Sequence, residues 1–245
     1  MKKINLIGRK NYRINDKIII HIPTLNEIRG ESDDDELNYN KTIVDFITTS
    51  TDYMIELHDC GINFEDLEDD YSFFIYKHII NNESVFPSDC HLMFDGIYES
   101  DFKVVEDNGD YYVVDTINNI VIDRKIFEEI SEIVCKSMFI EKQHRKFANK
   151  KSREYAIERA RKVRDRNKNK KTSSNLDDVI LFAVNNTNFK YNFDTVFKLT
   201  IYDFYASIKQ IQKNESVEHL MLGGYTGNLK LTEFTQNELS KFNVL

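Results

Sequence analysis

The fold is decided by the stretch Phe102-Lys-Val-Val-Glu-Asp-Asn-Gly-Asp-Tyr-Tyr-Val-Val-Asp115. Polar and apolar residues alternate on both sides of Asp107-Asn-Gly109. This tripeptide is a strong hairpin signal, because asparagine and glycine tolerate the backbone angles of a tight turn. A third alternating run follows over residues 119–123. The sequence therefore predicts a three-stranded meander.

Directly after the meander, apolar residues recur at helical spacing. One face of the expected helix holds Ile126, Phe127, Ile130, Ile133, Val134 and Met138. A helix with so regular an apolar face can close over the meander, so this part of the chain is expected to be α+β.

Two β-rich segments, residues 4–12 and 17–22, lie near the start of the chain, and Asn15-Asp16 between them supplies turn residues. An N-terminal hairpin is therefore expected. Pro23 ends the second strand, and Thr24-Leu-Asn-Glu27 matches a capping box, in which the threonine hydroxyl and the glutamate carboxylate accept hydrogen bonds from each other's backbone amides. A short helix is expected to begin there.

The segment that follows the hairpin is expected to be helical. Residues 43–47 and 53–57 have helical spacing, and Gly61 suits the left-handed conformation that ends a helix. A third helix is expected to open at Asn63. Its inward face is expected to hold Phe74, Ile75, His78 and Ile79.

The C-terminal part is also expected to be helical. Residues 173–178 offer several N-cap residues, and Thr200 opens an amphipathic helix. Its apolar face holds Ile201, Phe204, Tyr205, Ile208 and Ile211. Gly223-Gly-Tyr-Thr-Gly227 is expected to break the chain before a final segment in which Phe234 and Leu239 can dock.

The expected fold class is α+β and mostly helical, in three regions. Residues 1–140 hold the N-terminal β-hairpin, an acidic helical cluster and the central three-stranded meander with its covering helix. Residues 141–172 form an exposed basic helix, and residues 173–245 form a C-terminal helical region.

Charge is distributed unevenly along the chain, although the net charge is only −8. Residues 31–70 hold 14 acidic residues and one lysine, which gives −13. Residues 141–172 hold 14 basic and four acidic residues, which gives +10. We call these segments the acidic region and the basic segment.

The basic segment has helix-favouring composition but only a thin apolar stripe, formed by Tyr155, Ala156, Ile157, Ala160 and Val163. We expect it to be exposed, mobile or stabilised by a partner. One interpretation is nucleic-acid binding, because clustered lysine and arginine neutralise phosphates. The other is a solvated or protein-facing helix that is attracted electrostatically to the acidic region of this chain or of a neighbouring copy. The candidate partner-binding residues are Arg153, Arg159, Arg161, Lys162, Arg164 and Arg166.

The sequence offers little support for catalysis or metal binding. His58, Cys60, Cys90 and His91 carry zinc-binding groups, but their spacing fits no zinc module, and buried thiols with surface imidazoles are the simpler interpretation. The acidic runs 33–36 and 65–70 lack the glycine and distal glutamate of a calcium loop. The glycines at 223–227 lack the ending of a phosphate-binding loop. We expect no catalytic, metal-binding or cofactor-binding residues, no cofactor and no enzyme activity.

The same composition argues against a membrane or secreted protein. No stretch approaches the about 20 apolar residues that cross a bilayer, and residues 1–8 hold no apolar run of signal-peptide length. The three cysteines form no CxxC pair. We expect an intracellular protein with reduced thiols and no membrane partner.

Three pieces of sequence stand out together. They are Ile22-Pro-Thr-Leu-Asn-Glu-Ile28, Phe189-Lys-Tyr-Asn-Phe-Asp-Thr-Val196 before Ile208-Lys-Gln-Ile-Gln-Lys213, and Gly224-Tyr-Thr-Gly227. With the overall architecture, they resemble proteins encoded in the tail-morphogenesis region of phages and prophages of low-GC Gram-positive bacteria. The resemblance implies a tail assembly chaperone or a structural component of the tail, with phage tail proteins as partners and no catalytic residues. It places the protein in the host cytoplasm or the virion.

The basic segment departs from the pattern of that family in being unusually basic. This departure leaves open whether the segment contacts protein or nucleic acid, so a nucleic-acid-binding accessory protein remains the alternative function.

Overall fold

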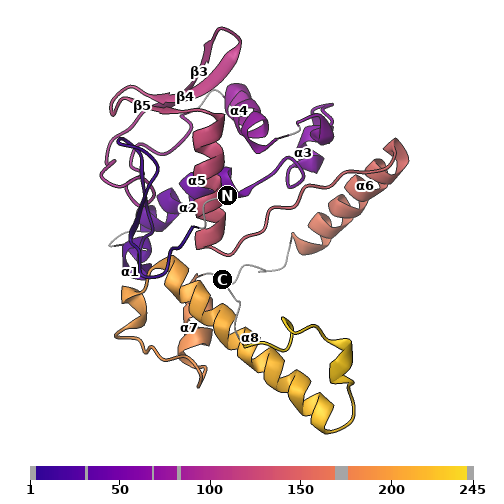
Figure 1. Cartoon of the computed structure of the whole chain (residues 1–245). Helices are drawn as coiled ribbons and strands as arrows, with labels where there is room; N and C mark the ends of the chain where they lie inside the picture. The colour runs from indigo at the N-terminus through magenta and orange to yellow at the C-terminus, as the bar shows by residue number, and fades with distance from the viewer. Residues whose placement is uncertain (1–3, 31–32, 68, 82–83, 169–175, 242–245) are drawn as a thin grey trace.

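The computed structural model describes residues 4–30, 33–67, 69–81, 84–168 and 176–241, and its fold is α+β with far more helix than strand (Figure 1). The N-terminal hairpin is confirmed: β1 (Asn11–Arg13) pairs antiparallel with β2 (Ile19–His21). Its strands are shorter than predicted, since residues 4–10 do not pair as a strand. Ile4 and Leu6 are nevertheless buried, whereas Ile7 is exposed, so the apolar residues Ile4 and Leu6 contribute to the core without strand pairing.

The capping box at Thr24 is confirmed. The Glu27 amide donates to Thr24 Oγ1 at 3.2 Å, and the Thr24 amide donates to Glu27 Oε2 at 2.7 Å. These bonds begin α1 (Leu25–Arg29).

The meander and its turn are confirmed as well. The strands β3 (Phe102–Asp107), β4 (Asp110–Asp115) and β5 (Ile120–Ile122) form an antiparallel sheet in that order. Asn108 and Gly109 both have positive φ, 54° and 89°, as a two-residue hairpin turn requires. The predicted helix follows as α5 (Arg124–Ser137), which buries Phe127, Ile130, Ile133 and Val134.

Packed aromatic rings form the centre of the main core. Phe46 on α2 (Asp33–Ile47) stacks on Phe127 of α5 at 5.1 Å between ring centroids. Phe74 on α4 (Asp70–Asn81) stacks on the same ring at 4.7 Å. The core also takes in Ile180 of α7 (Leu176–Val184) and Phe204 of α8 (Ile201–Tyr225), so helices from both ends of the chain share it.

A smaller core lies beneath α3 (Met54–Asp59) and the 3-10 helix η1 (Phe64–Asp66). Gly61 follows α3 with φ +77°, as its predicted role requires. The helix predicted to open at Asn63 is divided in two. The Asn63 side chain accepts from the Glu65 amide and opens only η1, whereas α4, which carries Phe74 and Ile75, begins after Asp69, whose side chain accepts from the Ser72 amide. Ile79, predicted to face inward, is 46% exposed. It lies about 100° around the helix from buried His78.

The break predicted over residues 223–227 is confirmed in its second half, where α8 ends at Tyr225 and the chain turns at Gly227 with φ +74°. It is wrong only in its first half, since Gly223 and Gly224 still belong to α8. A Cβ on Gly223 would lie 2.6 Å from the Leu229 side chain, and one on Gly224 would lie 2.5 Å from that of Leu231. The two glycines therefore serve close packing of the C-terminal tail against α8.

The tail includes η3 (Leu231–Glu233), and Phe234 and Leu239 are half-buried. The 3-10 helix η2 (Val196–Lys198) precedes α8, and Thr200 accepts from the Asp203 amide at 3.1 Å as the predicted N-cap. Most of the N-cap residues predicted before α7, those at 173–175, lie outside the described part of the chain.

Candidate functional site

The basic segment contains α6 (Lys150–Asn167), which lies at the edge of the molecule beside α3 (Figure 1). Its start is fixed by Asn149, whose side chain accepts from the Ser152 amide at 2.9 Å while Ser152 Oγ accepts from the Asn149 amide at 3.3 Å. The predicted apolar stripe is narrower than expected. Ile157 is 3% exposed, but Tyr155 is 69% and Val163 48% exposed, because those two side chains point away from α3.

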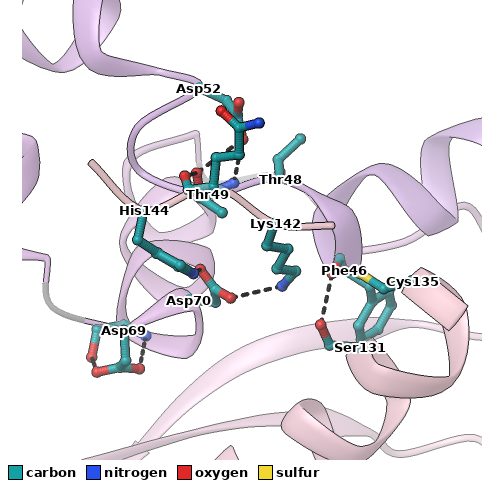
Figure 2. Close-up of polar contacts among 12 residues, drawn as sticks. Phe46, Thr48, Thr49, Asp52, Asp69, Asp70, Ser131, Cys135, Lys142 and His144 are labelled. Atoms are coloured by element: carbon teal, nitrogen blue, oxygen red, sulfur yellow. Dashed lines mark hydrogen bonds and ion pairs between the residues drawn. The ribbon is translucent and has the colours of Figure 1, made fainter. Parts of the chain in front are cut away.

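Residues 141–149, which precede α6 and which we call the strap, are bound to the body of the protein. Lys142 Nζ lies 2.8 Å from an Asp70 carboxylate oxygen, and His144 lies beside the same carboxylate (Figure 2). Thr49 Oγ1 donates to the backbone carbonyl of Gln143 at 3.2 Å. The Lys142 side chain is only 13% exposed, so its charge pairs with Asp70 within the fold and is largely shielded from solvent.

Glu65 of η1 joins the end of the strap to α6. Its carboxylate accepts from the Phe147 amide at 2.6 Å and from Arg153 at 2.7 Å. The Phe147 amide first, and then the Arg153 guanidinium, hold the pKa of the Glu65 carboxyl below its usual value, although desolvation opposes them. The Phe147 ring packs edge-on against Phe64.

Two further arginines of α6 pair with α3. Arg161 pairs with Asp59, and Arg164 Nη1 lies 2.9 Å from Glu56 Oε1. Between these pairs and that of Arg153, Ile157 enters the smaller core. All three acidic partners belong to the acidic region, so the basic segment forms ion pairs with that region of its own chain. Arg153, Arg161 and Arg164 form what we call the inward face of α6.

The other three predicted residues lie on the opposite side of the helix. Arg159, Lys162 and Arg166 are exposed and form no ion pair within the described parts of the chain. Lys151 and Tyr155 are exposed on the same side, at helical spacing from Arg159. We call Lys151, Tyr155, Arg159, Lys162 and Arg166 the outward face. Lys151 was not among the predicted residues, although its spacing of eight from Arg159 could have indicated it.

The residues considered for zinc have separate surroundings. His58 lies against Asp59 and Arg161, Cys90 is buried beside Ser100, and His91 stacks on Tyr98. Cys60 is exposed, so the expectation that all the thiols are buried is wrong. Among the described residues, no group of three or more His, Cys, Asp or Glu is placed to hold a metal ion.

One buried ionic cluster ties α2 to α4. Asp45 lies 2.6 Å from Lys77 Nζ and 3.0 Å from His78 Nε2, and its side chain is 4% exposed.

An open groove of about 700 Å³ runs between α4, the β3–β4 turn and the start of α5. Burial raises the pKa of Tyr71, which lines this groove, to about 12. A tyrosine with so high a pKa stays neutral at physiological pH.

A second groove, of about 780 Å³, lies between the N-terminal loop, residues 188–191 and the first half of α8.

Within the described ranges, no helix is both long and apolar enough to cross a bilayer.

One family model matches the C-terminal part of the chain. Residues 167–238 match the family model of the YomV second domain. That is a domain of a Bacillus phage-type protein, so this part of the chain is similar to a phage-related family. No curated protein and no solved structure matches the chain. The matched range begins at the end of α6 and holds α7, η2, α8 and η3.

Proposed function

We propose that this protein is a non-enzymatic phage assembly protein that acts by binding other proteins, as a tail assembly chaperone or as a structural component of the tail. The observation that carries the proposal is the phage-type domain over residues 167–238. The motifs at 189–196 and 224–227, which resemble tail-region proteins, lie within that range. The protein would act in the host cytoplasm, and as a structural component it would also be in the virion.

Exposed apolar side chains in the matched domain support binding to protein. On α7, Leu181 is 53% and Phe182 is 64% exposed, and at the end of α8, Leu222 is 61% and Tyr225 is 81% exposed. Large apolar side chains that stay in water at neighbouring positions mark interaction sites. The outward face of α6 adds a charged surface outside this domain.

The test is affinity capture of the tagged protein from infected or prophage-induced cells, followed by mass spectrometry, with mature particles analysed in parallel. Recovery of a tail protein with the bait missing from particles indicates a chaperone, and presence in particles indicates a structural component. Replacing Leu181 and Phe182 with serine should reduce capture. Replacing Ile80 and Ile117, two other exposed apolar residues, is the matched control and should not. Capture of no phage protein would contradict the proposal.

The second candidate is a nucleic-acid-binding accessory protein. The observation that favours it is the outward face of α6, where four exposed cations flank Tyr155. Binding to duplex DNA through these residues should weaken steeply as salt is added. Absence of binding at about 50 mM salt removes this candidate.

A further inference from the structure

The inward face of α6 shows what kind of surface this helix binds. Its cations stand at Arg153, Arg161 and Arg164, and the buried Ile157 stands between the first two. Their partners run in the opposite direction along the chain, from Glu65 through Asp59 to Glu56. The inward face therefore binds an acidic surface, part of which is the helix α3, in antiparallel order.

The outward face repeats this spacing two residues earlier. Lys151, Arg159 and Lys162 stand at i, i+8 and i+11, as the three inward arginines do, and Tyr155 takes the position of the buried isoleucine. A shift of two residues turns a helix by about 200°, which brings the repeat to the opposite side. Tyr155 is 69% exposed, whereas its inward counterpart is buried.

Acidic residues along one edge of the outward face favour a protein partner over a nucleic acid. Glu158 is exposed beside the cations and forms no ion pair among the described residues. Two further acids stand along the same edge, Glu154 near Lys150 and Asp165 near Lys168. The phosphates of a nucleic acid would be repelled by the acids along this edge. A partner helix whose carboxylates lie in one row can contact the cations alone, so that the acidic edge of α6 stays in solvent.

We propose that the outward face of α6 docks an acidic amphipathic helix of a partner protein, in the antiparallel order that α3 adopts on the inward face. The docked helix carries carboxylates opposite Arg159, Lys162 and Arg166, and an apolar side chain over Tyr155. α6 would then be held on both sides, by the acidic region of its own chain on the inward face and by the partner helix on the outward face. The inference rests on the proposed function, because it names the chemistry of the protein that is bound.

The test uses the full chain and a fluorescein-labelled helical peptide. Its glutamates stand at i, i+4, i+7 and i+15, and a leucine stands at i+11, in an alanine and glutamine background. These positions match Arg166, Lys162, Arg159, Lys151 and Tyr155 read backwards. A peptide of the same composition with its glutamates spread around the helix is the control. Fluorescence anisotropy should show binding of the patterned peptide and weaker binding of the control peptide.

Two variants of equal charge separate the face from the net charge. Reversing Arg159, Lys162 and Arg166 to glutamate should weaken binding of the peptide by about tenfold or more, because three attractions become repulsions. Reversing three exposed lysines elsewhere, Lys125, Lys190 and Lys198, changes the net charge equally and should leave binding within about twofold. Circular dichroism should show the same helix content in both variants, since all six side chains are exposed.

Three outcomes would overturn the inference. They are equal binding of the two peptides, equal loss in the two charge variants, or tighter binding of a duplex DNA oligonucleotide that is lost in the outward-face variant. None of these contradicts the proposed function unless capture from cells also fails, so the two proposals are tested separately.

Discussion

Replacing Ile157 with alanine is expected to release α6 from α3 without unfolding the main core. Ile157 is the one side chain of this 18-residue helix that is buried in the described structure. Alanine lacks three of its carbons, and each buried methylene contributes about 0.8 kcal/mol, so docking loses about 2.5 kcal/mol.

What remains to hold the helix is small. The three ion pairs of the inward face are partly exposed and together contribute about 1–2 kcal/mol. An isolated helix of this length is marginal in water. A loss of about 2.5 kcal/mol corresponds to a roughly seventyfold increase in the undocked population.

Hydrogen exchange measured by mass spectrometry is the assay. The amides of α6 should exchange roughly seventyfold faster in Ile157→Ala, while those of α5, which packs in the other core, should not change. Val163→Ala removes methyl groups from the same helix at a position that is 48% exposed, and it should leave exchange nearly unaltered. Equal exchange in the two variants would refute the assignment of docking to Ile157.

Three further predictions concern other contacts. Gly224→Val should place a side chain against Leu231 and free the C-terminal tail, which limited proteolysis would detect as faster cleavage after residue 225 at an unchanged melting temperature; unchanged cleavage would contradict the packing role. The pKa of Glu65 is lowered in the fold, so its stabilising contribution is complete above the ordinary value of 4.5 and is lost as pH falls through the lower folded value. The NMR shift of the Phe147 amide should report this loss, and Glu65→Gln should abolish its pH dependence. Asp45→Asn should destabilise the protein by about 3 kcal/mol in urea unfolding, because the Lys77 ammonium loses the buried carboxylate that it pairs with, and a change below about 1 kcal/mol would count against this.

Local structure followed from local sequence. The turn at Asn108-Gly109, the cap at Thr24 and the apolar face of α5 each depend on residues within a few positions of one another, so their periodicity and turn chemistry were sufficient. Where the sequence misled, the decisive contact lay farther away. The sequence placed a break within residues 223–227, but it did not show that Gly223 and Gly224 still belong to the helix and that residues 229–231 pack on them.

The candidate site divides in the same way. The sequence by itself determined that a basic helix and an acidic region occur in one chain, and it named six cationic residues without separating them. Tertiary structure alone decided that Arg153 and Arg164 face inward, because their partners lie 88 and 108 residues away in sequence. A charge pattern fixes the spacing of side chains around a helix, but only the packing of α6 on α3 fixes which side of that helix remains open to another molecule.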